Sequence, residues 1–227
     1  FEGFAGRPIE EFLFFHTGRI VTSDIQVWGG ISVNGDGPSD GDDDLSGSSE
    51  RDWLTGNAGD DRIEAGAGDD LVNGNGGLDI LFGQAGDDIV FGGAGNDELS
   101  GGTGADLLLG GTGHDLASYI DAKSGVTVAL DGSITATGDA VGDQFDGIEG
   151  VIGSNFDDVI RGSLDDDELD GRRGADVLAG GLGDDTYVFA DGDGSDTISD
   201  GRLVNGALDT GVNGGSNDII LFGDDVA

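Results

Sequence analysis

The amino-acid sequence predicts an all-β protein, a parallel β-roll (a β-helix solenoid) in two blocks with capping and inserted strands. Three observations predict this fold. A nine-residue repeat keeps its register from residue 38 to residue 118, one place in each repeat is aliphatic, and 48 of the 227 residues are glycine. A nine-residue repeat has room for only a very short strand, which is unstable alone, so the repeats must stack and share a narrow core.

Each repeat combines a glycine-rich turn with a short strand. Glycine at the first, second and fourth places permits the positive φ angles and close backbone approach that a tight turn needs. In the last three places the side chains alternate, so the eighth place points into the core. The eighth places of the first block are Leu45, Leu54, Ile63, Val72, Leu81, Val90, Leu99, Leu108 and Ala117.

The sixth place of every repeat in this block is aspartate. These residues are Asp43, Asp52, Asp61, Asp70, Asp79, Asp88, Asp97, Asp106 and Asp115. Successive turns fall on opposite edges, so one coil takes two repeats and aspartates two repeats apart stack on one edge. Carboxylates one strand spacing apart, about 4.8 Å, repel each other unless a cation lies between them. Paired carboxylates beside turn carbonyls favour calcium over magnesium, because the geometry is flexible.

The repeats, such as GQAGDDIVF at 83–91 and GGTGADLLL at 101–109, resemble the G-G-x-G-x-D-x-U-x nonapeptide of the RTX (haemolysin-type) calcium-binding family. The resemblance implies calcium between repeats n and n+2, held by two aspartates and backbone carbonyls. By repeat adjacency we expect roughly nine ions. The best sites implied are the pairs Asp61 with Asp79, Asp70 with Asp88, Asp79 with Asp97, and Asp88 with Asp106.

The sequence divides the chain into five predicted segments. Residues 1–37 predict an N-terminal β cap and a degenerate repeat with Asn34 at the aspartate place, and residues 38–118 are the first block. Residues 119–152 predict an inserted β segment, with strands at 126–130 and 148–152 around an acidic loop. Residues 153–199 form the second block, and residues 200–227 a partial repeat and cap. The further sixth-place candidates for metal binding are Asp158, Asp167, Asp176, Asp185, Asp196 and Asp218.

Some acidic residues depart from the pattern. Ser48 and Glu50 replace turn glycines before Asp52, which predicts a weaker site there. Phe156 and Asp165 likewise replace the fourth-place glycine, so the first two repeats of the second block are weaker. We interpret the loop acids at 139, 143 and 146 as solvated, with binding of another ion as the alternative.

The outward seventh places of the even-numbered repeats form an apolar ladder, defined as Trp53, Leu71, Ile89 and Leu107. The corresponding places of the odd-numbered repeats are mostly polar. A large exposed apolar face is unusual for a monomer. We therefore predict that this face is covered by flanking segments of the chain, with the inserted segment as a candidate, or that the ladder contacts a protein partner or mediates self-association. The alternative is that scattered outer apolar residues are ordinary on a solenoid.

Composition excludes several classes of function. The net charge is −38 with nine basic residues, so nucleic acid is not an expected partner. No apolar run is long enough for a transmembrane segment. Both histidines lie in turns, and neither a Ser–His–Asp triad nor a phosphate-binding loop is present. We therefore expect no enzyme site in this chain.

These observations predict a calcium-binding module of a secreted bacterial protein that folds on binding extracellular calcium after export. The resemblance further implies type I secretion and an extracellular or cell-surface location. Two alternatives stay open. The chain is either the C-terminal secretion and stability module of a secreted hydrolase, a protease or lipase whose catalytic domain is absent, or a structural adhesin or surface-layer module.

Overall fold

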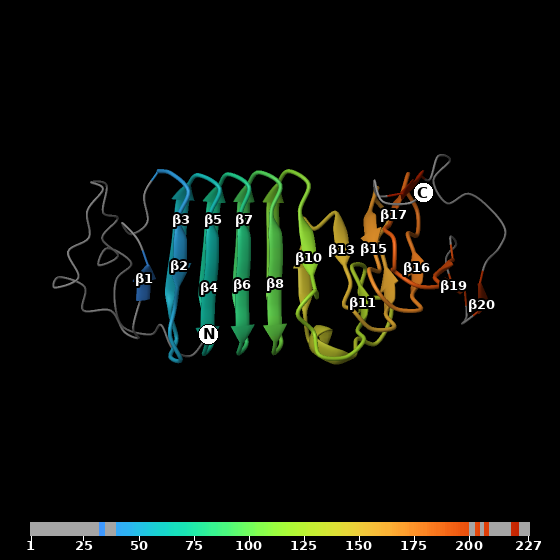
Figure 1. The fold of residues 1–227 in the computed structure, drawn as a ribbon, viewed down its shortest axis with the longest axis horizontal. Helices are drawn as coiled ribbons and strands as arrows, with labels where there is room; N and C mark the ends of the chain where they lie inside the picture. The colour runs from blue at the N-terminus through green and yellow to red at the C-terminus, as the bar shows by residue number, and fades with distance from the viewer. Residues whose placement is uncertain (1–31, 35–39, 200–202, 205–206, 209–218, 223–227) are drawn as a thin grey trace.

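The computed structural model describes residues 32–34, 40–199, 203–204, 207–208 and 219–222. These residues form a parallel β-roll, in which strands of successive coils stack along one axis (Figure 1). A short 3-10 helix, η2 (Gly138–Ala140), lies in the inserted segment. Residues 1–31 of the predicted N-terminal β cap and the candidate ligand Asp218 lie outside the described residues. None of the helical structure described is long and apolar enough to cross a membrane.

One face of the roll is a ten-stranded sheet, here called the long sheet. Its strands in spatial order are β1 (Ser32–Asn34), β2 (Asp44–Ser46), β4 (Arg62–Ala67), β6 (Ile80–Ala85), β8 (Glu98–Thr103), β10 (Leu116–Ser118), β13 (Gly150–Ile152), β15 (Glu168–Asp170), β17 (Thr186–Phe189) and β21 (Ile219–Phe222). Strand β1 pairs antiparallel with β2, which places Asn34 in a strand rather than in a repeat turn. The other pairings in the long sheet are parallel.

The second face consists of two separate sheets. The five-stranded sheet has the order β12 (Gln144–Asp146), β9 (Leu107–Thr112), β7 (Ile89–Ala94), β5 (Leu71–Gly76) and β3 (Trp53–Ala58). The four-stranded sheet has the order β11 (Thr127–Ala129), β14 (Val159–Arg161), β16 (Val177–Ala179) and β18 (Thr197–Ile198). Strands β19 (Leu203–Val204) and β20 (Ala207–Leu208) form an antiparallel pair of their own.

The register confirms that one coil takes two repeats. Trp53 pairs with Leu71, and Leu71 pairs with Ile89. Strands β3 to β9 are each six residues long, whereas the pattern predicted three. They are longer because parallel pairing continues into the following turn, where Asn57 pairs with Asn75.

The predicted core is confirmed. The eighth-place side chains are buried from Leu45 to Ala117 and from Ile160 to Tyr187, whereas Ile198 in the last repeat of the second block is 37% exposed. Burying one such side chain stabilises the fold by about 1.5–3 kcal/mol. In the last coil the core residue is Tyr187, and its hydroxyl accepts a hydrogen bond of 2.9 Å from the backbone N–H of Gly180.

The inserted segment extends the roll, and the prediction that it covers the apolar ladder is wrong for the residues described. Strand β12, inside the predicted loop, adds to the five-stranded sheet beside β9, and β13 adds to the long sheet beside β10. Phe145 lies in register with Leu108 and Val151 with Ala117, so both take inward places. The insert therefore supplies a coil of irregular spacing. The other predicted strand, at 126–130, contains β11, which begins the four-stranded sheet.

The apolar ladder is part of the surface of the five-stranded sheet. Its members lie in register on neighbouring strands. Trp53 is 38% exposed and Phe91, on the same sheet, is 39% exposed. A partner for this face remains a proposal.

Candidate metal centres

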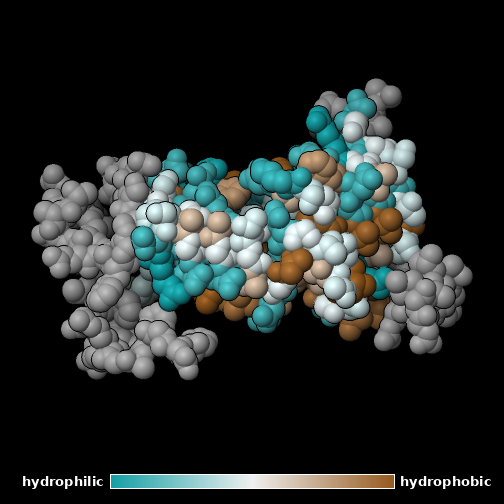
Figure 2. Space-filling model, turned by 90° about the horizontal axis from the view of Figure 1, so that it is seen from below, coloured by the Kyte–Doolittle hydropathy of each residue, from teal (hydrophilic) through white to brown (hydrophobic). Residues whose placement is uncertain are grey.

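The sixth-place aspartates form columns along the edges of the roll. The backbone N–H of most of them donates a hydrogen bond to Oδ1 of the aspartate two repeats later, as in Asp79 to Asp97 at 2.9 Å. The same bond joins Asp43 to Asp61, Asp52 to Asp70, Asp61 to Asp79, Asp70 to Asp88, Asp88 to Asp106, Asp97 to Asp115, Asp158 to Asp176, Asp167 to Asp185 and Asp176 to Asp196. The structure therefore brings the predicted pairs together. Figure 2 shows one edge, where hydrophilic residues border a strip of near-neutral ones.

The second carboxylate oxygen of many of these aspartates is buried without a hydrogen-bond partner among the described residues. These are the Oδ2 atoms of Asp61, Asp70, Asp79, Asp88, Asp97, Asp106, Asp115 and Asp176. An unsatisfied buried acceptor costs about 1–3 kcal/mol, and more when it is charged. Because this free-energy penalty recurs along both columns, we interpret these oxygens as ligand-binding atoms.

The turn glycines leave room for such a ligand. The point where a Cβ on Gly74 would stand lies 2.1 Å from Oδ2 of Asp79 and 2.8 Å from the carbonyl oxygen of Gly92. Gly92 occupies the first place of the repeat two further on, so the two oxygens come from neighbouring coils. The equivalent point at Gly83 lies 2.4 Å from Oδ2 of Asp88 and 2.7 Å from the carbonyl oxygen of Gly101.

The donor set is entirely oxygen. The described residues contain no cluster of three or more His, Cys, Asp or Glu side chains that could hold a metal ion. Backbone carbonyls must therefore complete any coordination that the paired carboxylates begin. Hard divalent cations, calcium above all, accept such mixed carboxylate and carbonyl ligands.

Burial changes the protonation of the columns. Desolvation raises the pKa of Asp79 to about 6 and that of Asp88 to about 7. For Asp88 the hydrogen bond from the Asp70 backbone opposes this shift, and the charges of Asp106 and Asp70 add to it. Without a cation, the columns therefore hold protons close to neutral pH.

Three turns are built differently, and we call them the serine turns. In each, a second-place serine donates its backbone N–H over 2.6 Å to Oδ2 of its own aspartate, and its hydroxyl also donates to the carboxylate. The pairs are Ser48 with Asp52, Ser154 with Asp158, and Ser163 with Asp167. In these turns the protein itself satisfies the Oδ2 atom.

The backbone explains the difference. In regular turns the second place has a positive φ, for example 111° at Gly66 and 75° at Asn75. The second-place serines are not among the residues with positive φ, and their N–H groups face the carboxylate. The residue that replaces the fourth-place glycine then donates its N–H to the serine hydroxyl, as Asp165 does to Ser163 over 3.1 Å.

Two acids of the inserted segment also join the columns; the sequence analysis favoured a solvated role for the first and missed the second. The N–H of Asp106 donates to Oδ1 of Asp143 over 3.0 Å, and the N–H of Asp115 donates to Oε2 of Glu149 over 2.9 Å. The interpretation of Asp143 as a solvated acid is therefore wrong. Sequence separations of 37 and 34 residues hid the relation. A usable signal existed, because Phe145 follows Asp143 by two places, as the core residue does in each repeat.

Comparison with known protein families supports the geometry. The model of the RTX calcium-binding nonapeptide repeat matches residues 39–72, 55–90, 64–99, 82–117 and 152–187. Together these segments cover just over half of the chain and include the sixth-place aspartates from Asp43 to Asp185. Residues 118–151, which contain Asp143 and Glu149, lie outside the match. No curated protein matches the chain.

Proposed function

Because the chain belongs to the RTX family, whose nonapeptide repeats bind calcium ions, we propose that it is a module of a secreted protein that folds when it binds extracellular calcium. Such a β-roll is a structural module rather than a catalytic one. The observation that carries the proposal is the row of buried Oδ2 atoms in the regular turns that have no hydrogen-bond partner among the described residues.

The proposed ligands are the sixth-place aspartates of the regular turns together with first-place carbonyls two repeats on. Asp61, Asp79 and Asp97 would serve one edge, and Asp70, Asp88 and Asp106 the other. Calcium would supply the positive charge that these columns lack. At the serine turns, hydrogen bonds take over this role at the Oδ2 atoms, so we assign Asp52, Asp158 and Asp167 a smaller share in binding.

Charge makes folding depend on the cation. The chain carries a net charge of −38, and its carboxylates stack along narrow edges. Self-repulsion of this kind opposes the compact state. Calcium binds the folded sites and not the expanded chain, so the binding free energy becomes folding free energy. In a low-calcium cytosol the chain would stay expanded for export, and it would fold in millimolar calcium outside the cell.

Circular dichroism in the far ultraviolet tests the proposal directly. The protein is titrated with calcium from chelator to several millimolar, with magnesium as the control cation. We expect a cooperative rise of the β signal with calcium alone. A complete β signal in chelator would contradict the proposal.

A matched pair of variants localises the effect. Asp88 lies between Asp70 and Asp106 in its column, whereas its neighbour Asp87 is exposed and accepts the N–H of Ala105 over 3.0 Å. Asp88→Asn and Asp87→Asn make the same change in charge one residue apart. We expect Asp88→Asn to bind fewer ions and to need more calcium to fold, while Asp87→Asn behaves like the wild type. Equal effects would show that only net charge matters.

A second candidate function, structural contact through the apolar ladder, is favoured by the exposure of Trp53 and Phe91 on one sheet. In this role the folded module would self-associate or bind another protein. Sedimentation velocity in calcium, comparing the wild type with Trp53→Ser, tests self-association. A monomeric wild type at high protein concentration would exclude it.

A further inference from the structure

The joint between the regular repeats and the inserted coil lies beside an interruption of the roll. Both sheets cross the joint itself, with Leu116 of β10 paired to Gly150 of β13 and Leu107 of β9 paired to Gln144 of β12. Beyond the inserted coil only the long sheet continues, because the five-stranded sheet ends at β12 and the four-stranded sheet begins at β11. The inserted coil is therefore held in the five-stranded sheet on the side of the regular repeats alone, and contacts at the turns of this joint add to that hold.

The turn that enters β13 is unusually short. Asp146 lies in register with Leu109 and Gly150 with Leu116, so residues 147–149 stand where the regular repeat has residues 110–115. The acid of this turn is Glu149, which has one methylene more than aspartate. The longer side chain brings Oε2 to 2.9 Å from the N–H of Asp115, the distance that also separates the Asp97 N–H from Oδ1 of Asp115.

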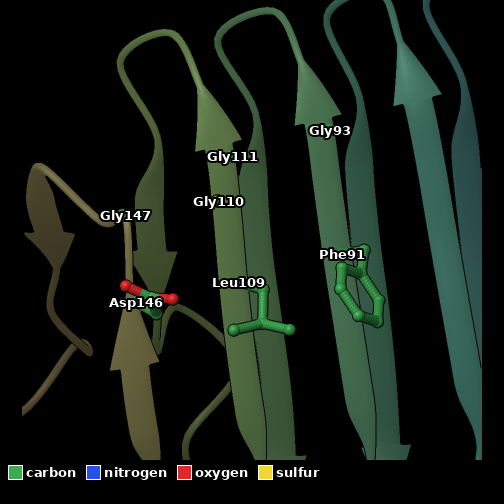
Figure 3. A pocket seen from close by; sticks show the side chains of 7 residues that line it. All are labelled: Phe91, Gly93, Leu109, Gly110, Gly111, Asp146 and Gly147. Atoms are coloured by element: carbon green, nitrogen blue, oxygen red, sulfur yellow. The ribbon is translucent and has the colours of Figure 1, made fainter.

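The short turn also reproduces the carbonyl of a regular site. The point where a Cβ on Gly110 would stand lies 1.8 Å from the carbonyl oxygen of Gly147 and 2.6 Å from Oδ2 of Asp115. One coil earlier, the point at Gly92 lies 2.7 Å from the carbonyl oxygen of Gly110 and 2.5 Å from Oδ2 of Asp97. Figure 3 shows Gly147 beside Gly110 and Gly111, where β12 and β9 lie next to each other.

An unpaired oxygen points into this space. Asp115 is wholly buried, and its Oδ2 has no hydrogen-bond partner among the described residues. We propose that Asp115, Glu149 and the carbonyl oxygen of Gly147 form a further calcium site, which joins the regular repeats to the inserted coil. This inference rests on the proposed calcium-dependent function, but its key residue lies outside the family match.

The cation would tie the two parts of the roll together at the edge of the long sheet. A carboxylate on each side of the joint would share one positive charge, so the joint would open only with loss of the ion. The regular repeats would then unfold as one unit with the inserted coil and the second block in calcium, although one face of the roll is interrupted beyond β12.

Glu149→Gln tests the site, because the amide oxygen can still accept the Asp115 N–H while the charge is lost. Glu98→Gln is the matched control, since Glu98 is an outward residue of β8 in the same sheet. Bound calcium is counted after equilibrium dialysis by elemental analysis. We expect one ion fewer per chain in Glu149→Gln and no change in Glu98→Gln. The inference is overturned if Glu149→Gln binds as many ions as the wild type.

Thermal unfolding in saturating calcium gives an independent readout. We expect a single transition for the wild type and two for Glu149→Gln, and a single unchanged transition in that variant would also overturn the inference. If Glu149→Gln does not fold, Glu149→Asp carries the test. This variant keeps the negative charge, but its side chain is one methylene shorter. We expect it to lose the same ion at calcium concentrations that saturate the wild type. If Glu149→Asp binds as many calcium ions as the wild type, the site is refuted. A wild type that binds no calcium would instead refute the proposed function itself.

Discussion

The hydroxyl of Tyr119 donates a hydrogen bond of 2.8 Å to Oδ2 of Asp143, whose Oδ1 accepts the backbone N–H of Asp106. Both carboxylate oxygens of Asp143 are thus bound by the protein. Burial raises the pKa of Asp143 to about 7 and raises that of Tyr119 as well. A tyrosine therefore closes the aspartate column beside the five-stranded sheet.

The coupling between these two side chains can be measured with Tyr119→Phe, Asp143→Asn and the double variant. Urea unfolding in saturating calcium is followed at about pH 8.5, where Asp143 is ionised. A hydrogen bond to a charged group contributes about 1.5–3 kcal/mol, and we expect a coupling energy in this range. Additive effects of the two substitutions would mean that the bond contributes nothing to stability.

The serine turns should be convertible into calcium sites. Ser163→Gly combined with Asp165→Gly changes the turn GSLDDD at 162–167 into GGLGDD, the sequence already present at 180–185. The conversion removes the donors that satisfy Oδ2 of Asp167 and restores glycine where φ is positive in regular turns. We expect one additional calcium ion per chain by elemental analysis. Ser163→Ala is the control: it loses only the hydroxyl, so its ion count should equal that of the wild type.

The raised pKa values predict opposite pH dependences with and without calcium. Asp88 and Asp176 have pKa values of about 7 in the folded protein, against an ordinary value of 3.8. The folded calcium-free form therefore binds protons more tightly than the unfolded chain, and acidification from about pH 7 to pH 4 should stabilise it. Protons compete with calcium, so the calcium midpoint should rise as the pH falls below about 7. Circular dichroism at a series of pH values checks both trends, and the absence of any gain in β signal on acidification in chelator would contradict the first.

Because neighbouring coils approach closely at some glycines and not at others, we expect substitution by alanine to lower the unfolding free energy by different amounts at two glycines with positive φ. A Cβ on Gly77 would stand 1.8 Å from the carbonyl oxygen of Gly59, whereas a Cβ on Gly132 meets nothing within 4 Å. Gly132→Ala should cost only the backbone strain, about 1–2 kcal/mol. Gly77→Ala must also move backbone, and we expect it to lower the unfolding free energy by clearly more. If urea unfolding shows equal losses of unfolding free energy for the two variants, neighbouring coils can move apart without a free-energy penalty.

The fold could be predicted because each place of the repeat meets the same surroundings one coil later. The aspartate at the sixth place marks the edge of the roll, and the aliphatic residue at the eighth place marks its core, as Asp79 and Leu81 illustrate. Those signals need no knowledge of distant contacts. The sequence pattern did not reveal the stacking in the inserted segment, where Glu149 lies on Asp115 across a gap that no period describes.

The serine turns show a second limit of sequence reasoning. Replacement of glycine at Ser48 and Glu50 predicted a weaker site at Asp52, but not its cause. The cause is the direction of one backbone N–H, which depends on the sign of φ at the second place. A residue with a side chain, such as Asn75, can also adopt a positive φ at this place, as glycine does. Residue type alone therefore does not determine which kind of turn forms.

The hydrogen bonds of the columns all run one way, from the amide of one coil to the carboxylate of the next. The beginning of a column is therefore unlike its end. At Asp52, the first described member of its column, Oδ1 has no donor among the described residues, whereas Asp143 at the other end of that column donates its backbone N–H to the carbonyl oxygen of Ala140 over 3.3 Å. The column is therefore open at its first end, and the inserted segment closes its last end. A coil added before Asp52 would meet an acceptor of complementary chemistry, so such modules can lengthen by duplication at that end in a fixed orientation.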